Sequence, residues 1–371
     1  MNKKKTLSDK PERPDYWLLC AALLLACFGL MMVLSASGIM AERFFGDKYL
    51  FFKKQGIFLV GGIIMMYISS RLPKAVFYNM VYVWLMGAFI LLLLCDFTPL
   101  SVAAGGATRW IALGPIRIQP LEFCKPALVL YLAYFFSRKQ ELIKTFSVGF
   151  LPPFAITGAL CLLLMLQPDF GGSVFLCMIL FFMSLVGGTR VSYLLTSLFF
   201  AGGAGYMLIT SSPYRLKRMT AFIDPFKSAH EEGYQLVQSL YAFGSGNIFG
   251  QGLGAGKQKL FFLPEAHNDF IMAVVGEELG FIGVLAVFMV VAFLVWRGFR
   301  IALAQEDLQD RFTAYGLTIM LALGFVLNLA VVMGTVPPKG VPMPFVSYGG
   351  SSLLISCTCI GILLNLSRGK V

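Results

Sequence analysis

Charged residues are scarce in this chain. Of its 371 residues only 13% are charged and 58% are apolar, and the mean hydropathy is +0.77. Soluble domains contain about 25% charged residues, so this composition excludes a soluble globular protein. Because lipid offers no partners for backbone groups, a membrane span needs a helix of roughly 20 apolar residues. We therefore predict an all-α polytopic membrane protein.

Histidine is rare and paired cysteine motifs are absent. The chain has two histidines, and its eight cysteines lie in or at the ends of apolar stretches without a CxxC pair. A structural zinc site needs four close ligands, so a protein-caged zinc site is not expected. The net charge of +11 is spread over short loops, which indicates membrane orientation and no nucleic-acid partner.

Long apolar runs are what the chain does have. They predict about ten transmembrane helices in a single membrane domain of residues 17–366, between an N-terminal tail (1–16) and a C-terminal tail (367–371). The predicted spans are 17–37, 55–71, 76–95, 121–137, 148–167, 172–188, 191–210, 270–296, 312–334 and 346–366.

Positive charge differs between the two sides of these spans. Ten spans place both termini on one side, whose short loops and tails carry sixteen Lys and Arg residues, against seven in the short loops opposite. Cytoplasmic loops are enriched in these residues, so both termini are predicted to be cytoplasmic.

The loop of residues 211–269, between spans 7 and 8, is much longer than the other connections. It is predicted to be extracytoplasmic, and a loop of this length is usually functional or disordered. Apolar residues at helical spacing over 234–241 favour a short amphipathic helix near the membrane surface. A basic stretch that contains Arg215 and Lys217 is expected close to lipid headgroups.

Charged residues near membrane depth are costly and mark candidate functional sites. Pro120 fits the first position of a helix, and it would place Glu122 and Lys125 on one face at the outer end of span 4. Arg109 precedes this pair on the same side. The cluster is either part of a site or an ion pair that only neutralises itself.

A second charged cluster stands where the long loop enters span 8. Asp269 is expected in the first turn of a helix, where free backbone N–H groups and the helix dipole stabilise a carboxylate. Capping does not explain Glu277 and Glu278, which lie a turn or two deeper, where charge is hard to solvate. His267 lies two residues before Asp269.

Two loops combine lysines with backbone that is unsuited to helices. Glycines between 244 and 256 precede Lys257, and such backbone can cradle phosphate; the pattern is no Walker loop, and a flexible or tightly turned loop fits equally well. Four prolines between 337 and 344 predict an irregular loop around Lys339. Lys339 is a candidate anion ligand, with a purely structural role as the alternative.

A series of ordered motifs extends over nearly the whole chain. They are Asp15-Tyr16-Trp17-Leu18-Leu19, Ser35-Ala36-Ser37, the segment from Arg109 to Lys125, Gln167-Pro168-Asp169-Phe170-Gly171, the stretch from Gly233 to Gly256, Pro264 to Glu278, and Lys339 to Ser352. Together they resemble the SEDS family (shape, elongation, division and sporulation) of bacterial membrane proteins, and most of all its cell-division branch. The chain departs from the family pattern at Asn268, where Thr is usual, and at Leu121, where Ser is common.

The resemblance implies a peptidoglycan glycosyltransferase that polymerises lipid II with inversion and releases undecaprenyl pyrophosphate. It implies that Asp269 is the catalytic residue, either as the base or as a ligand of a divalent cation, Mg²⁺ or Mn²⁺; no organic cofactor is expected. The candidate substrate-binding residues are Arg109, Glu122, Lys125, Arg215, Lys217, Lys257, His267 and Lys339.

The same resemblance implies substrates, partners and a location. Lipid II and the nascent lipid-linked strand would be the substrates, and a class B penicillin-binding protein (a transpeptidase) and other divisome membrane proteins the partners, at the division septum of the bacterial cytoplasmic membrane. Two other functions stay open: a lipid II flippase would use the same intramembrane charges, and a non-catalytic divisome scaffold would need only its surfaces. The residues alone indicate a lipid-phosphate enzyme or a transporter.

Overall fold

The computed structural model describes residues 13–104, 107–114, 116–260, 262–337 and 340–368. Its elements in chain order are α1 (Tyr16–Phe45), α2 (Leu50–Arg71), α3 (Lys74–Tyr78), α4 (Val81–Phe97), β1 (Ser101–Ala104), β2 (Ala107–Leu113), β3 (Ile116–Ile118), α5 (Pro120–Arg138), η1 (Gln140–Leu142), η2 (Phe146–Phe150), α6 (Leu151–Leu166), α7 (Phe170–Gly187), α8 (Val191–Thr210), α9 (Pro213–Ile223), α10 (Tyr234–Gly246), α11 (Ile271–Leu303), α12 (Leu308–Val332) and α13 (Gly350–Ser367).

Each of the ten predicted spans corresponds to a helix of this bundle, so the all-α polytopic prediction is confirmed. Within the described part of the chain, eight helices are long and apolar enough to cross a membrane. The other two predicted spans are α4, which has 17 residues, and α5, whose 19 residues include Glu122, Lys125 and Arg138. Helix ends differ from the predicted ends by several residues; α1, for example, continues to Phe45.

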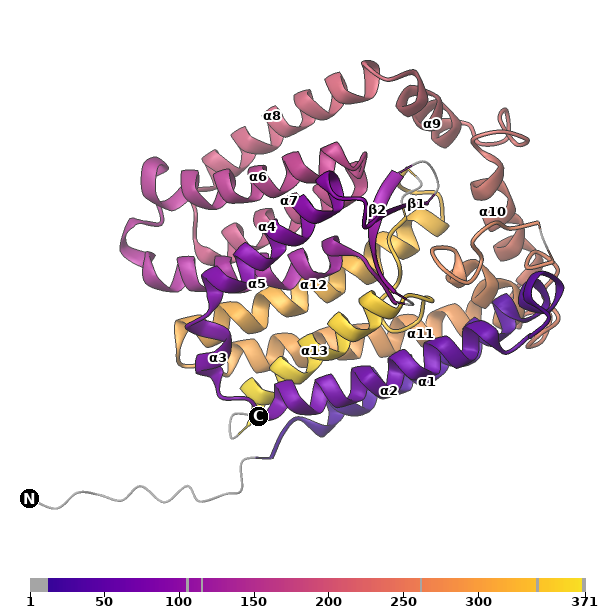
Figure 1. Cartoon of the computed structure of the whole chain (residues 1–371), viewed down its shortest axis with the longest axis horizontal. Helices are drawn as coiled ribbons and strands as arrows, with labels where there is room; N and C mark the ends of the chain where they lie inside the picture. The colour runs from indigo at the N-terminus through magenta and orange to yellow at the C-terminus, as the bar shows by residue number, and fades with distance from the viewer. Residues whose placement is uncertain (1–12, 105–106, 115, 261, 338–339, 369–371) are drawn as a thin grey trace, which may run out of the picture.

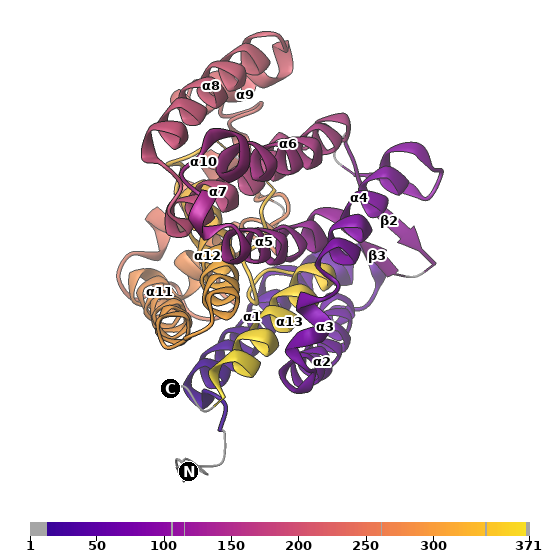
Figure 2. The ribbon, with the colours of Figure 1, turned by 90° about the vertical axis from the view of Figure 1, so that its left-hand side faces the viewer.

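Burial divides the helices into a centre and a periphery. Most of α12 and α13 is buried, and both lie in the middle of the bundle beside α5 (Figure 2). Helix α8 lies at the edge and is almost wholly exposed, with apolar residues such as Phe199 facing outward. An apolar helix with so little burial is stable only where lipid surrounds it.

The described ends of the chain meet at one end of the bundle (Figure 1). The backbone N–H of Asp15 donates to Ser367 Oγ over 2.9 Å, and Arg297 Nη2 lies 2.7 Å from Asp15 Oδ2. These contacts join the first turn of α1 to the last turns of α13 and α11. The first and last described residues therefore lie on the same side of the bundle.

A small antiparallel sheet, which the sequence analysis did not predict, lies at the opposite end of the bundle (Figure 1). Its order is β1-β2-β3, with Ser101 paired to Ile111 and Ile111 paired to Ile118. The three strands occupy the loop between α4 and α5 and end directly before Pro120, the first residue of α5. The sheet thus fixes Arg109, in β2, at the outer end of the bundle.

The long outer loop contains two helices. Helix α10 coincides with the predicted amphipathic segment, and it packs on α11 and α12. Helix α9 carries the basic stretch with Arg215 and Lys217 and follows α8. The loop is therefore ordered by burial of apolar side chains such as Leu236 and Val237.

Helix α11 is broken at Gly280, where φ is 66° and ψ is −165°. This conformation is essentially restricted to glycine. The outer loop pairs with the backbone groups around the break. Gln251 N donates to Glu277 O over 3.0 Å, Gly252 N to Glu278 O over 3.0 Å, Phe281 N to Asn247 O over 2.9 Å, and Ile282 N to Ile248 O over 3.2 Å.

The break predicts the effect of adding one methyl group. A Cβ atom at Gly280 would lie 2.3 Å from Gly250 N, so Gly280→Ala should lower the free energy of unfolding by at least about 1–3 kcal/mol. The control is Gly202→Ala in α8, where a Cβ meets no atom within 4 Å and alanine favours the helix by about 1 kcal/mol. Thermal unfolding in detergent micelles compares the two; equal midpoints would contradict a required glycine at the break.

Candidate active site

Asp269 lies at the outer end of the bundle, two residues before the start of α11. The expectation that it caps this helix is wrong: residues 264–270 form turns, Phe270 occupies the capping position, and no side chain caps the helix. The Asp269 carbonyl instead accepts a hydrogen bond of 2.8 Å from Asn328 Nδ2. Its carboxylate faces Gly340, because a Cβ atom at Gly340 would lie 3.0 Å from Asp269 Oδ2.

Burial sets the ionisation of Asp269. Removal from water raises its pKa to about 7, and the nearby negative charge of Glu265 acts in the same direction. The positive charge of Arg109 lowers the pKa, so the guanidinium is close enough to act on the carboxylate. A carboxyl with a pKa near 7 is suited to accept a proton at neutral pH.

Arg109 connects the motif of residues 109–125 to the motif of residues 167–171. Its Nη2 donates to Pro168 O over 2.8 Å, and its Nε lies 3.8 Å from Asp169 Oδ1. Asp169 caps α7 through a 3.0 Å hydrogen bond from Gly172 N. Among the described atoms the buried Arg109 Nε has no hydrogen-bond partner, which leaves one donor of this cation for an anion.

Glu122 and Lys125 form the predicted ion pair in the first turns of α5. Lys125 Nζ lies 2.6 Å from Glu122 Oε1, both side chains are buried, and the ammonium lies 4.5 Å from the ring centre of Phe175 in α7. Glu122 therefore orients Lys125, as expected, but the ammonium is already used by a carboxylate and an aromatic ring. Phosphate binding by Lys125 stays a prediction, and it would require this buried pair to open.

His267 is buried in an aromatic cluster. Its ring centre lies 4.8 Å from that of Phe51 in α2 and 5.6 Å from that of Tyr348, and its carbonyl accepts a 2.9 Å hydrogen bond from Tyr348 N. Burial lowers the pKa of His267, so the ring stays neutral at pH 7. These contacts support a packing role that holds the loop before Asp269.

The glycine-rich loop is bound to the two glutamates of α11. Glu277 accepts from the backbone N–H groups of Lys257 and Gln258, and Glu278 accepts from that of Gly254. These amides cannot also cradle a phosphate, so this part of the phosphate-cradle interpretation is wrong. Of the two alternatives, the structure favours the tightly turned loop.

A buried cation completes this contact. Lys259 Nζ lies 2.5 Å from Glu278 Oε1, with side chains only 3% and 0% exposed. Ser35 Oγ, in α1, donates to Glu278 Oε2 over 2.7 Å and accepts from Lys259 over 3.0 Å. We call Ser35, Lys259 and Glu278 the buried latch, because they join α1, the glycine-rich loop and α11.

The remaining predicted basic residues lie apart from Asp269. Arg215, in α9, donates to Leu208 O over 3.0 Å; Lys217 and Lys257 are exposed. In the described part of the chain no hydrogen bond or ion pair connects these three side chains to Asp269. Lys339 lies outside the described residues. Substrate binding by these four residues stays a prediction.

A divalent cation at this site would have few protein ligands. Among the described residues no three His, Cys, Asp or Glu side chains are close enough to hold a metal ion. Mg²⁺ is commonly bound by one or two carboxylates together with water and the phosphates of a substrate. Asp269 fits this arrangement as the one carboxylate ligand, and the substrate would supply the other ligands.

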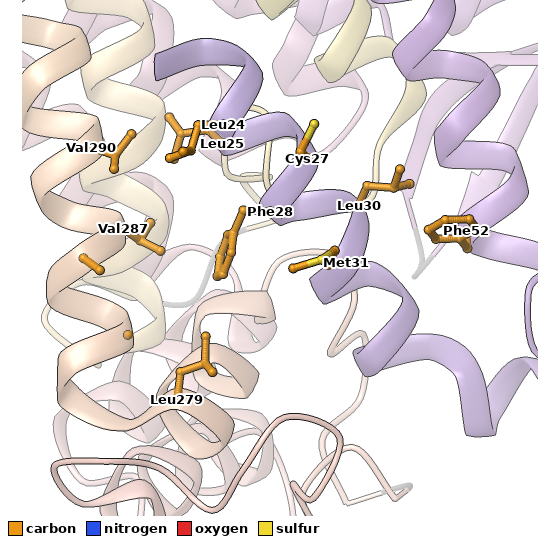
Figure 3. A pocket seen from close by; sticks show the side chains of 12 residues that line it. Leu24, Leu25, Cys27, Phe28, Leu30, Met31, Phe52, Leu279, Val287 and Val290 are labelled. Carbon is orange, nitrogen blue, oxygen red and sulfur yellow. The ribbon is translucent and has the colours of Figure 1, made fainter. Parts of the chain in front are cut away.

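A cavity lies between α1 and α11 (Figure 3), and Asp269 is not among the residues that line it. It has a volume of about 610 Å³, and Phe28, Leu279 and Val287 are among its lining residues, all apolar. Such a lining cannot stabilise the charge of a pyrophosphate. The cavity is therefore a feature of the lipid-facing surface and not of the candidate active site.

The sequence analysis missed three polar contributors to the site. Asn328 could have been found from the sequence, because a lone amide in the apolar span 312–334 is costly unless it is hydrogen-bonded. Glu265 was quoted only within a motif, and its positive φ of 53° follows from the turn. Ser35 was likewise quoted only within a motif, and its contact with Glu278 comes from a helix far away in sequence.

Together the fold and the site define a class: a multi-span membrane protein with a half-buried carboxylate and an arginine at one end of a helical bundle. A family model described as "Cell cycle protein", which covers FtsW, RodA and SpoVE, matches residues 16–370. The chain belongs to this family, which is the SEDS family of the sequence analysis.

Relatives in three organisms show the extent of the similarity. The chain is 42% identical over 357 residues to "Probable peptidoglycan glycosyltransferase FtsW" of Geobacter sp. (strain M18), covering 96% of this chain and 97% of the relative. It is 44% identical over 355 residues to the protein of the same name in Trichlorobacter lovleyi, covering 96% and 93%. It is 39% identical over 366 residues to "Stage V sporulation protein E" of Bacillus subtilis, covering 98% and 99%.

Two solved structures share the architecture. A chain from a peptidoglycan synthase complex, described as coordinating polymerization and crosslinking, superposes with a TM-score of 0.79 at 26% identity, covering 95% of this chain and 97% of that chain. The rod shape determining protein RodA of Thermus thermophilus gives a TM-score of 0.68 at 26% identity, covering 96% and 97%.

The buried latch predicts a large effect of removing one partner. Glu278→Ala would leave the Lys259 ammonium buried with only Ser35 as a partner, so the free energy of unfolding should fall by about 3–5 kcal/mol. The matched control is Asp47→Ala, which breaks a 2.8 Å pair with Lys53 on the exposed surface and should leave the midpoint unchanged. Thermal unfolding in detergent measures both, and similar midpoints for the two variants would contradict the latch.

Proposed function

We propose that this protein is a peptidoglycan glycosyltransferase that polymerises lipid II into glycan strands for the septal wall of dividing bacteria. One observation carries the proposal: Asp269, a half-buried carboxylate with a pKa near 7, lies at the outer end of a SEDS bundle within the influence of Arg109. The names of the relatives, among them peptidoglycan glycosyltransferases, agree with this chemistry.

The reaction exchanges one bond for another at an anomeric carbon. The 4-hydroxyl oxygen of the acceptor sugar forms a bond to the donor's anomeric carbon, the bond from that carbon to the pyrophosphate breaks, and configuration inverts. Ionised Asp269 accepts the hydroxyl proton, and the oxygen becomes a stronger nucleophile as the proton leaves. Arg109, whose positive charge acts on Asp269, stabilises negative charge on the departing pyrophosphate.

A divalent cation, Mg²⁺ or Mn²⁺, provides the alternative role for Asp269. In that case Asp269 would hold the cation instead of acting as the base, and the bound cation would supply charge stabilisation for the leaving group. Arg109 and the half-buried position of Asp269 keep their roles in this arrangement, because both act on charge in a site partly shielded from water.

The setting of the reaction follows from the membrane fold. Asp269 is proposed to face the extracytoplasmic surface, with both termini in the cytoplasm, as the charge distribution over the short loops indicates. A class B penicillin-binding protein is the proposed partner for crosslinking, in line with the similarity to a chain of a peptidoglycan synthase complex. Other divisome membrane proteins are further proposed partners.

The proposal predicts that the carboxylate of Asp269 is essential. Asp269→Asn keeps the shape and removes the base, so strand synthesis should fall by at least about 100-fold. The matched control is Asp224→Asn, an exposed residue of the same loop that pairs with Lys227 over 2.8 Å; it should retain activity. Purified protein with its cognate transpeptidase, fluorescent lipid II and Mg²⁺ or Mn²⁺ provides the assay, with products separated on a gel.

The outcomes of this assay separate the three functions. A ladder from the wild type that is lost in Asp269→Asn supports the glycosyltransferase. If no ladder forms, movement of lipid II across vesicle membranes would support a flippase. Absence of both activities, with septal recruitment retained, would support a scaffold.

The pH dependence is a further prediction. Because burial raises the pKa of Asp269 to about 7, the carboxyl is increasingly protonated as the pH falls below 7 and cannot accept a proton. The kcat/KM of strand synthesis should therefore rise about tenfold per pH unit below pH 7 and level off above it. The Asp224→Asn variant should give the wild-type profile, and a profile that is flat between pH 5.5 and 8 would contradict Asp269 as the base.

A further inference from the structure

We propose that Asn328, in α12, is a positioning residue that fixes the catalytic carboxylate of Asp269. The inference rests on the proposed function of Asp269 and adds a residue to the machinery of the same reaction. It arises from a hydrogen-bonding arrangement that joins two loops at the outer end of the bundle.

The Asn328 amide bridges two segments that are distant in sequence. Its Nδ2 donates to Asp269 O and to Val341 O, each over 2.8 Å. One acceptor belongs to the turn before α11 and the other to the loop between α12 and α13. Both amide hydrogens are therefore used to hold these loops side by side.

The position of this amide indicates that the bridge is required. The side chain is 1% exposed and lies near the outer end of a helix that is otherwise mostly apolar. A buried amide without partners costs about 1–3 kcal/mol, so the side chain is tolerated here because its donors are paired. Among the described atoms its Oδ1 has no partner, so the contact with the two loops consists of the donors alone.

The bridge positions the carboxylate of Asp269 by setting the distance between the two loops. By holding Asp269 and Val341 together, Asn328 places Gly340 against the carboxylate, where a Cβ atom would lie 3.0 Å from Asp269 Oδ2. A carboxylate that lies this close to a neighbouring loop has less freedom to turn. A shift of about 1 Å in such a group reduces the rate about 100-fold.

The charges that face Asp269 are set by the same arrangement. Glu265, on the same loop, raises the pKa of Asp269, and Arg109, on β2, lowers it. Burial is the largest cause of the raised pKa.

The fold supplies a matched control at the other end of the bundle. Asn365, near the end of α13, also donates through Nδ2 to two backbone carbonyls, those of Ser69 over 3.2 Å and Leu72 over 2.7 Å. Asn328→Leu and Asn365→Leu remove the same chemistry, two bonds from one amide, with a side chain of similar size. Only Asn328 contacts the segment of Asp269.

The test measures steady-state strand synthesis by wild type, Asn328→Leu and Asn365→Leu, with the cognate transpeptidase, lipid II and Mg²⁺ or Mn²⁺ present. Asn328→Leu should lower kcat by about 10–100-fold with KM changed less than twofold. Asn365→Leu should keep the wild-type kcat and KM.

Asn328→His provides a second variant, because its ring N–H retains one donor. It should give a kcat between those of wild type and Asn328→Leu, and it decides the question alone if Asn328→Leu does not fold. A kcat equal to wild type in the folded Asn328 variants, or equal losses in Asn328→Leu and Asn365→Leu, would overturn the inference. Failure of the wild type to form strands would instead count against the proposed function.

Discussion

The break in α11 is the constraint on which the outer end of this protein depends. Lipid offers no hydrogen bonds, so a helix interrupted at membrane depth needs protein partners for the freed backbone groups. The glycine-rich loop supplies them on both sides of Gly280. This pairing brings the loop close enough for Glu277 and Glu278 to accept its amides, and it fixes the start of α11 directly after Asp269.

Asp269 differs from the buried carboxylates of the bundle in its distance from the nearest cation. Glu122, Glu278 and Asp15 are buried, and each has a cation within 2.7 Å. Within the described part of the chain Asp269 has no such ion pair, and Arg109 acts on it only from a distance. The paired carboxylates join elements of the bundle and serve structure, whereas Asp269 has a raised pKa and can exchange a proton near pH 7.

Several parts of the site were predictable because they depend on local sequence. Pro120 marked the start of α5, and the spacing of Glu122 and Lys125 placed them on one helix face. The small sheet was not predictable, because strands of three to seven residues in a loop leave no clear periodicity. The capping role expected of Asp269 was wrong because the helix begins two residues later, and helix ends are the least certain feature of a sequence-based prediction.

The sequence by itself determined the membrane class, the positions of the apolar helices and the motifs that mark the family, since apolar runs and local spacing are properties of neighbouring residues. Only the tertiary structure decided which polar groups meet. Ser35 reaches Glu278, and Asn328 holds Asp269 beside Val341, across distances in sequence that no local pattern encodes. The physical reason is that burial and pairing of a polar group depend on which helices and loops pack together, and packing is set by the whole bundle.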